Sequence, residues 1–203
     1  VLFANELLDA QPFVRMRADS SGWREMGVDL DEQGQLAEIP LAQHSADALE
    51  LLPHLPPNPP EGYRVDCSVA AERLLDSLLQ GMDSGLVVLI DYGRLWQELV
   101  SACPAGTART YRRHEAGQDL LAHPGEADIT CHVCWDRLQR VLENAGLSGL
   151  ALERQEAFFV KHGQSAMRAL IEEAASGFSR DKQTLQELLH PGHMGAKFQV
   201  LSA

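Results

Sequence analysis

Two unbroken runs of apolar residues predict buried strands near the start and the middle of the chain. Residues 1–4 read Val-Leu-Phe-Ala, and residues 85–91 read Gly-Leu-Val-Val-Leu-Ile-Asp. Such runs are typical of parallel strands that are covered on both faces. The side chains at the ends of the two runs are Asn5, Glu6, Asp9, Asp91 and Tyr92. Since ligands bind just outside the carboxyl ends of such strands, we expect these side chains to share one site.

Alternation of apolar and polar residues predicts three further strands after the first run. Residues 13–17 and 23–30 alternate and are joined by Ala-Asp-Ser-Ser-Gly, which is the pattern of a β-hairpin. Residues 36–39 form a third alternating segment after a glycine-containing turn. We therefore expect a β-rich insertion over about residues 13–40. Five prolines within residues 53–60 predict an extended, exposed connector after it.

Helical periodicity marks most of the remaining elements. A helix is predicted where apolar residues recur every three or four positions or where the composition favours one. These segments are residues 46–52, 68–82, 134–145, 155–162, 165–175 and 182–189. Two more strands are predicted at residues 150–153 and 197–201. We expect a loop-rich insertion over about residues 94–130, which contains an arginine-rich, strand-like piece at 107–114. The order of these elements indicates an α/β sandwich.

Charge and composition narrow the classes of function. The 203 residues carry 29 acidic and 17 basic side chains, and the formal net charge of -12 argues against binding to nucleic acid or to an anionic membrane surface. No apolar run approaches the roughly 20 residues of a membrane span. Because the chain begins in mid-strand without a methionine, we expect it to be the later part of a larger protein.

The four cysteines were considered as disulfide or metal ligands. They are too few for the disulfide framework of a small secreted protein, and they indicate reduced thiols in a cytosol-like compartment. The segment Cys131-His-Val-Cys134 has one pair of thiols, whereas a structural zinc site usually requires two such pairs. We therefore expect no metal, and we interpret Cys131 and Cys134 as small buried side chains.

Six separated segments resemble one known family when they are taken in order. They read ANELLDA, WREMGVDL, LIDYG, GTARTYRRH, GEADITCHV and MGAKFQVL. These segments are similar to those of the MidA-like proteins, the family of the mitochondrial complex I assembly factor and its bacterial relatives. The resemblance implies a Rossmann-like class I methyltransferase fold, a three-layer α/β sandwich. Residues 1–203 would form the C-terminal two-thirds of that domain.

The resemblance also implies an activity, a cofactor and partners. It implies a protein arginine methyltransferase that uses S-adenosylmethionine and acts on a protein substrate, which is a respiratory complex subunit for the mitochondrial member. The implied location is the cytoplasm for a bacterial-type relative and the mitochondrial matrix for eukaryotic members. The glycine-rich turn that holds the cofactor in relatives has no counterpart in this sequence, so no residue is assigned to the cofactor. The competing hypothesis is a non-catalytic binding or assembly module, and either form is compatible with an oligomer.

The acidic residues that follow the first strand are candidate ligands for a guanidinium group. Methyl transfer mainly requires alignment of the nucleophile, and carboxylates hold a guanidinium by accepting paired N–H bonds. We therefore assign Glu6 and Asp9 as the catalytic pair, with Asn5 orienting the substrate. Alternatively, the two acids cap the following turn and Asn5 satisfies its backbone. Asp91 and Tyr92 would shape the pocket, or they would form an ordinary turn at the end of the strand.

Two later segments complete the predicted site. Arg109 and His114 would contact an acidic partner peptide or a carboxylate within the site, and a histidine can exchange a proton near neutral pH. The alternative is a basic stretch that is merely solvated. Asp128 and Thr130 would line the pocket or cap the helix that follows them.

Overall fold

The computed structural model describes residues 1–82, 84–113, 115–173, 180–190, 192 and 194–203. Its central sheet has the strand order β1-β6-β13-β12. These strands are β1 (Leu2–Asn5), β6 (Val87–Asp91), β13 (Gln199–Ser202) and β12 (Ala151–Arg154). The strands β1 and β6 are parallel, as their apolar runs predict, so both carboxyl ends lie at the same edge of the sheet. The strand β13 runs antiparallel to both of its neighbours.

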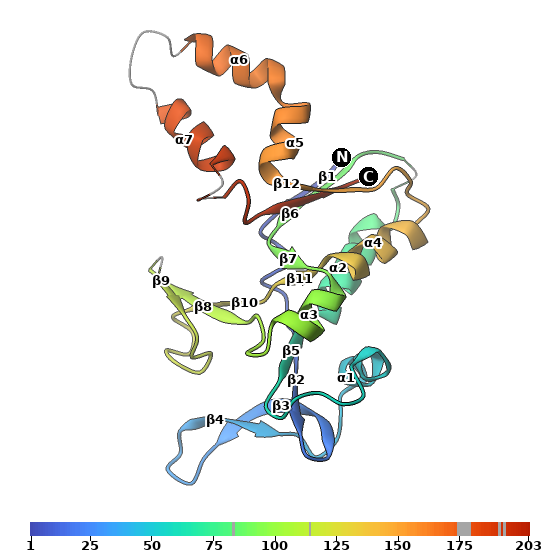
Figure 1. The fold of residues 1–203 in the computed structure, drawn as a ribbon, viewed down its shortest axis with the longest axis vertical. Coiled ribbons are helices and arrows are strands. Elements are labelled where there is room, and N and C mark those ends of the chain that lie inside the picture. The colour runs from blue at the N-terminus through green and yellow to red at the C-terminus, as the bar shows by residue number, and fades with distance from the viewer. Residues whose placement is uncertain (83, 114, 174–179, 191, 193) are drawn as a thin grey trace.

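Helices cover both faces of this sheet (Figure 1). They are α2 (Val69–Leu79) and α4 (Trp135–Asn144) on one face and α5 (Gln155–His162) on the other, whereas α6 (Gln164–Glu173) and α7 (Arg180–Leu189) pack against α5. Leu89 of β6 belongs to the core cluster that α2 and α4 complete. Val88 and Ile90 instead belong to a cluster with Phe158 and Phe159 of α5. Because successive side chains of a strand point to opposite faces, β6 is covered on both sides and the predicted sandwich is confirmed.

A second sheet, with the order β4-β3-β2-β5, projects from the sandwich (Figure 1). Its strands are β2 (Val14–Asp19), β3 (Gly22–Leu30), β4 (Leu36–Pro40) and β5 (Arg64–Cys67). The predicted hairpin and third strand are confirmed, and the short helix α1 (Ala46–Leu51) and the 3-10 turn η1 (Leu52–His54) follow them. The sequence pattern missed β5, because three of its four residues are buried and no alternation marks it.

The segment expected to be loop-rich, at about residues 94–130, contains regular structure. It includes α3 (Trp96–Ala102) and a small sheet of β8 (Arg109–Arg112), β9 (Glu115–Gly117) and β10 (Asp128–Thr130). The strand β7 (Gly93–Arg94) pairs with β11 (Val133–Cys134). The helix α3 depends on a distant partner, since the Asp136 side chain accepts a hydrogen bond from the Trp96 backbone N–H at 2.9 Å. Local sequence carries no sign of that contact.

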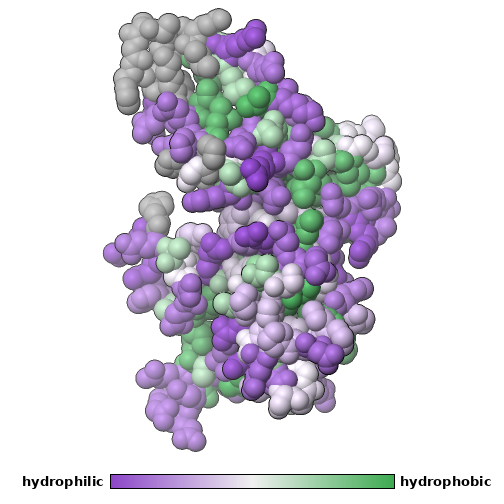
Figure 2. Space-filling view, viewed as in Figure 1, coloured by the Kyte–Doolittle hydropathy of each residue, from purple (hydrophilic) through white to green (hydrophobic). Residues whose placement is uncertain are grey.

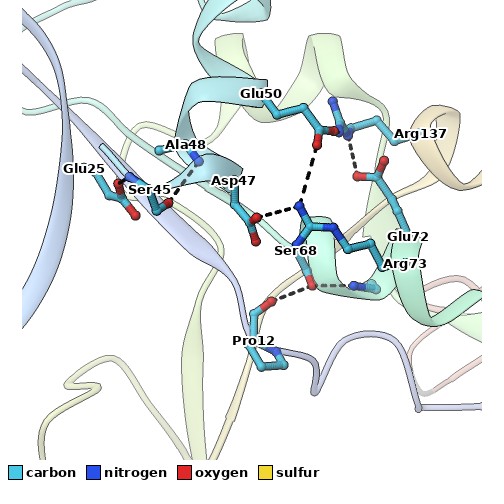
Figure 3. Close-up of polar contacts among 11 residues, drawn as sticks. Pro12, Glu25, Ser45, Asp47, Ala48, Glu50, Ser68, Glu72, Arg73 and Arg137 are labelled. Carbon is cyan, nitrogen blue, oxygen red and sulfur yellow. Dashed lines mark hydrogen bonds and ion pairs between the residues drawn. The ribbon is translucent and has the colours of Figure 1, made fainter. Parts of the chain in front are cut away.

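A polar network ties the second sheet to the sandwich (Figure 3). The buried guanidinium of Arg137, on α4, donates to Glu72 of α2 at 2.5 Å and to Glu50 of α1 at 2.6 Å. Arg73 of α2 donates to Asp47 of α1 at 2.6 Å. Ser68 caps α2 by accepting from the Ala71 N–H, and its hydroxyl donates to the Pro12 carbonyl at 2.7 Å. Through these contacts α1 is held against α2 and α4.

Candidate active site

The chain leaves β1 in a conformation that is unusual for its residue type. Glu6 has a φ of 48°, in the left-handed region, and its N–H donates to the Ile90 carbonyl of β6 at 2.9 Å. A non-glycine residue in this region stores of the order of 1–2 kcal/mol of strain and is worth attention at a strand end. The neighbouring Asn5 side chain donates to the Glu6 carboxylate at 3.4 Å. The left-handed turn thus directs the chain from the sheet edge into the loop that carries Asp9.

Asp91 holds that loop in place through hydrogen bonds to its backbone. Its carboxylate accepts hydrogen bonds from the backbone N–H groups of Leu8 and Asp9, both at 3.2 Å, and of Tyr92 at 2.9 Å. The side chain is almost completely buried, at 1% exposure. Burial, together with the nearby Asp9 carboxylate, raises the pKa of Asp91 to about 7. Asp91 therefore positions the loop, and it does not line the cavity described below.

Asp9 and Tyr92 form the next layer of the site. The Tyr92 hydroxyl donates a short hydrogen bond to Oδ2 of Asp9. The other oxygen, Oδ1, is buried and has no hydrogen-bond partner among the described residues. Burial, and then the bond to Asp9, raises the pKa of Tyr92, so its hydroxyl remains a donor. A buried carboxylate oxygen without a donor is costly, and a ligand that supplies an N–H relieves that cost.

Aromatic and cationic groups surround the Tyr92 ring. The Arg109 guanidinium carbon lies 5.9 Å from the ring centroid, which is within cation–π range. His132 and Phe198 each meet the ring edge-on, with centroids 5.5 Å away. A nitrogen of Arg109 lies 2.6 Å from Nε2 of His132. The side chains of Arg109, His132 and Phe198 thus define the environment of the tyrosine from three directions.

His132 is neutral in this environment. Burial, followed by the positive charges of Arg109 and Arg94, lowers its pKa to about 4. Because Arg109 can only donate, Nε2 of His132 must be the acceptor, and the ring proton is assigned to Nδ1. That Nδ1 is buried and has no partner in the described part of the chain. His132 and Asp9 thus each have one buried polar atom without a hydrogen-bond partner among the described residues.

These groups open onto a cavity of about 1410 Å³ at the carboxyl ends of β1 and β6. The sequence-predicted residues that line it are Glu6, Asp9, Tyr92, Arg109, Asp128 and Thr130. Asn5 and Asp91 do not line it, and His114 lies outside the described residues. The cavity is bounded by the β8–β10 sheet on one side and by the segment that leads into β13 on the other. Most of the predicted site is thus gathered around one space.

Sequence reasoning missed several residues of the same cavity. They are Arg94, His132, Arg154, Lys197 and Phe198. A local signal existed for His132, since it stands two positions after Thr130 in an extended segment and so shares its side of the chain. The other four belong to the ends of β7, β12 and β13, and only the pairing of those strands brings them here.

The described residues include no group of three or more His, Cys, Asp or Glu side chains arranged to hold a metal ion. The thiols of Cys131 and Cys134 are buried, and burial raises the pKa of Cys131. None of the connections that lead from a strand to a helix in the described chain contains a glycine, so these residues do not form a glycine-rich cofactor turn. No helix there has the length and apolarity to cross a membrane.

Comparison with known families and sequences gives consistent matches. Residues 1–152 match the family model Methyltransf_28, described as "Putative S-adenosyl-L-methionine-dependent methyltransferase". The chain is 26% identical over 204 residues to the mitochondrial protein arginine methyltransferase NDUFAF7 of Xenopus laevis, covering 98% of this chain and 44% of that protein. It is 25% identical over 203 residues to the Homo sapiens protein of the same name, with the same coverage. The chain thus spans less than half the length of these curated relatives.

Two solved structures from Burkholderia thailandensis have the same fold. One is an uncharacterized COG1565 superfamily protein, with a TM-score of 0.86 and 28% identity; the match covers 98% of this chain and 54% of that one. The other is a COG1565 superfamily member bound to S-adenosyl-homocysteine, with a TM-score of 0.86 and 27% identity over 98% of this chain and 52% of that one. Both neighbours are therefore about twice as long as the chain described here.

Proposed function

The chain belongs to the Methyltransf_28 family of S-adenosyl-L-methionine-dependent methyltransferases, and from this premise we propose that the complete protein methylates an arginine side chain of a protein substrate. The curated relatives bear the name of protein arginine methyltransferases, which supports this choice of acceptor. A respiratory complex subunit is the finer proposal for the substrate. By the same reasoning the protein would act in the cytoplasm of a bacterium or, as the names of the eukaryotic relatives state for those proteins, in mitochondria.

One observation carries the proposal, namely the buried oxygen of Asp9 that has no hydrogen-bond partner among the described residues. Oδ1 of this carboxylate is buried at the wall of the cavity without a donor from the described residues. Glu6 lines the same cavity and is exposed, so a second carboxylate is available to the same ligand. A guanidinium presents several N–H donors in one plane and matches two carboxylates well. No other common side chain offers that many donors at once.

Each neighbouring group then has a task in holding the acceptor. Asp91 fixes the backbone of the loop, and the Tyr92 hydroxyl binds Oδ2 of Asp9, which leaves Oδ1 without a donor from the described residues. Alignment of the nucleophilic nitrogen is the main requirement of methyl transfer. The guanidinium nitrogen that gains a methyl group loses one proton, and the exposed Glu6 carboxylate can receive it and release it to solvent. Thr130 and Asp128 complete the wall.

The cofactor is assigned to the part of the domain that the described residues do not form. S-adenosylmethionine supplies the methyl group in this family, and the matched structure with S-adenosyl-homocysteine extends well beyond the segment that this chain covers. We propose that residues 1–203 form the substrate side of the domain, with insertions at about residues 13–40 and 94–130. The large cavity at the strand ends, lined by acidic, basic and aromatic groups, supports that assignment.

The proposal is tested with the full-length protein and radiolabelled S-adenosylmethionine. We expect transfer to arginine in a protein extract, and a loss of about 100-fold or more in the rate for Asp9→Asn and Glu6→Gln with unchanged cofactor affinity, because each change removes one charged acceptor. Asp29→Asn, on the distant strand β3, is the matched control. Transfer to a residue other than arginine would refute the proposal. A full-length protein that binds no cofactor would favour the assembly-module alternative.

A further inference from the structure

The cavity is richer in cations than the chain that forms it. The whole sequence has 17 basic and 29 acidic side chains. The basic residues that line the cavity are Arg94, Arg109, Arg113, Arg154 and Lys197, and its acidic residues are Glu6, Asp9, Glu98 and Asp128. Basic side chains are thus a minority overall but outnumber the acids at this one place. Local gathering of one sign of charge focuses the field toward a ligand of the opposite sign.

Three of these cations have no acidic partner among the side chains that the structure describes. Arg94 lies 3.6 Å from Glu98, and Arg154 lies 4.0 Å from Glu156. By contrast, the described residues place no carboxylate within ion-pair distance of the cationic groups of Arg109, Arg113 and Lys197, which we call the cation trio. Arg109 faces His132, which is neutral. Unpaired like charges around a shared space repel one another, so an anion bound there would be stabilised.

The trio lies beside the proposed guanidinium site rather than inside it. Tyr92 connects the two, since its hydroxyl bonds to Asp9 and its ring contacts Arg109 and Phe198, the residue that follows Lys197. Asp9 is 3% exposed, whereas Arg113 and Lys197 are exposed. An arginine that reaches Asp9 therefore leaves its own backbone near the exposed cations. An extended chain advances about 3.3–3.6 Å per residue, so the residues on either side of that arginine would lie in or at the cavity that the trio also lines.

The surface view agrees with a peptide lying across this region. In Figure 2 the surface is indented between the lobe formed by α5–α7 and the β8–β9 ribbon, and hydrophilic residues border the indentation. Arg113 follows β8, Lys197 precedes β13, and both side chains line the cavity. The two exposed cations thus come from two elements that are far apart in the sequence but share one cavity.

We propose that Arg109, Arg113 and Lys197 bind an aspartate or glutamate side chain next to the methylated arginine, so that the enzyme selects arginines with acidic neighbours. This inference rests on the proposed function and adds its substrate specificity. A carboxylate at this position forms charge-assisted hydrogen bonds with guanidinium or ammonium donors. An arginine with basic neighbours would bring further positive charge to the trio and would be rejected.

The test measures binding of labelled nine-residue peptides to the full-length protein saturated with S-adenosyl-homocysteine. Three peptides have a central arginine flanked on both sides by glutamate, glutamine or lysine, and a fourth has a central glutamine flanked by glutamate. We expect the glutamate-flanked arginine peptide to bind about tenfold more tightly than its glutamine-flanked counterpart, and we expect salt to reduce this advantage. The double variant Arg113→Gln, Lys197→Gln should lose the advantage. Arg112→Gln should keep it, because Arg112 pairs with Glu126 and does not line the cavity.

The outcomes separate this inference from the proposed function. The role of the trio is overturned if the glutamate- and glutamine-flanked arginine peptides bind equally, or if the double variant keeps the advantage of the glutamate-flanked peptide. In either case, tighter binding of a central arginine than of a central glutamine would still support the proposed function. If the peptide with a central glutamine binds as well as that with arginine, the guanidinium site is wrong and the trio binds acidic peptides without it. If no peptide binds, the substrate does not lie across this surface and the inference is overturned.

Discussion

Asp9 and Asp91 are carboxylic acids at neighbouring strand ends, and their hydrogen bonds give them different tasks. Asp91 accepts three backbone N–H bonds, which leaves it buried and occupied. Asp9 accepts one hydroxyl hydrogen bond, and its other oxygen is buried without a partner among the described residues. The sequence predicted that both would shape a site, but their positions relative to the cavity depend on the loop that lies between them. A residue type at a strand end is therefore not enough to assign a role.

Removal of the Tyr92 hydroxyl should show how much its hydrogen bond to Asp9 contributes to stability. Tyr92→Phe leaves the ring in place and removes the donor to Asp9, so we expect the free energy of unfolding to fall by about 1–3 kcal/mol. Urea denaturation measures this change. Tyr111→Phe is the matched control, since Tyr111 lines the same cavity but its hydroxyl makes no hydrogen bond to a described residue. Equal losses in the two variants would show that the bond to Asp9 contributes nothing specific.

The pKa of Asp91 leads to a prediction about pH. In the unfolded chain this carboxyl loses its proton near pH 4, whereas in the folded protein it does so near pH 7. Between these values the folded state holds the additional proton, so a rise in pH lowers the contribution of Asp91 to stability. We therefore expect the free energy of unfolding of the wild type, relative to Asp91→Asn, to decrease from pH 4 to pH 7. Urea titrations at several pH values test this, and a difference that is constant or increases with pH would contradict it.

Among the elements, short segments depend most on contacts that are distant in sequence. The strand β5 is held by β2, and the Asp66 carboxylate on it accepts N–H bonds from Thr107 and Ala108 at 2.7 and 2.8 Å. Asp66 also binds Arg15 of β2 at 2.7 Å. One buried carboxylate thus connects two strands of the second sheet with the loop that leads into β8. Because these partners are about 40 and 50 positions away, no local pattern marks the strand.

Gly106 gives this connection a sharp test. It has a φ of +77°, and a Cβ atom added there would overlap the Asp66 carboxylate. Gly125 has the same φ but open space around the position of its Cβ. Both Gly→Ala variants carry the cost of the left-handed backbone, so we expect Gly106→Ala to lower the melting temperature further than Gly125→Ala, by several degrees. If the two variants melt together, the contact of Gly106 with Asp66 does not limit stability.

At the scale of the whole molecule, the sandwich and the second sheet are joined through both apolar and charged groups. The core of the second sheet includes Val69 of α2 and Cys134, so it continues into the helices of the sandwich. The Arg137 network adds a polar connection between α1, α2 and α4 (Figure 3). Burial raises the pKa of Glu72, and the Arg137 guanidinium opposes that shift. We therefore expect the two parts to unfold as one unit.

Arg137→Met should remove the ion pairs that connect α1, α2 and α4. It leaves Glu72 buried without its partner, and we expect a loss of about 3–5 kcal/mol in the free energy of unfolding. The double variant Arg137→Met, Glu72→Gln should recover part of that loss, because the unpaired charge is gone. Arg140→Met, an exposed position on the same helix, serves as the control. Calorimetry measures all three, and a loss no larger than that of the control would refute the importance of the network.

The sequence by itself determined the family and most of the elements. The apolar run of residues 85–91 and the alternation in 13–30 correspond to β6 and to the β2–β3 hairpin, because burial on two faces or on one leaves a local pattern. The resemblance of six segments to one methyltransferase family is confirmed by the match of residues 1–152 and by the solved structures. Glu6 and Asp9 were predicted as site residues because they follow a run of apolar residues. The prediction that this run is covered on both faces is wrong for β1, which is at the edge of the described sheet and has Phe3 exposed.

Only the tertiary structure decided which side chains share the cavity and which support it. Tyr92 and Asp9 are 83 positions apart, and the pairing of β1 with β6 brings them into contact. Lys197 and Phe198 reach the same place because β13 pairs with β6 in antiparallel register. The burial of Asp91 and the pairing of β5 could not be predicted from the sequence either. Local patterns record how each segment is buried, whereas a site depends on contacts between segments, and those contacts are fixed only when the sheet is assembled.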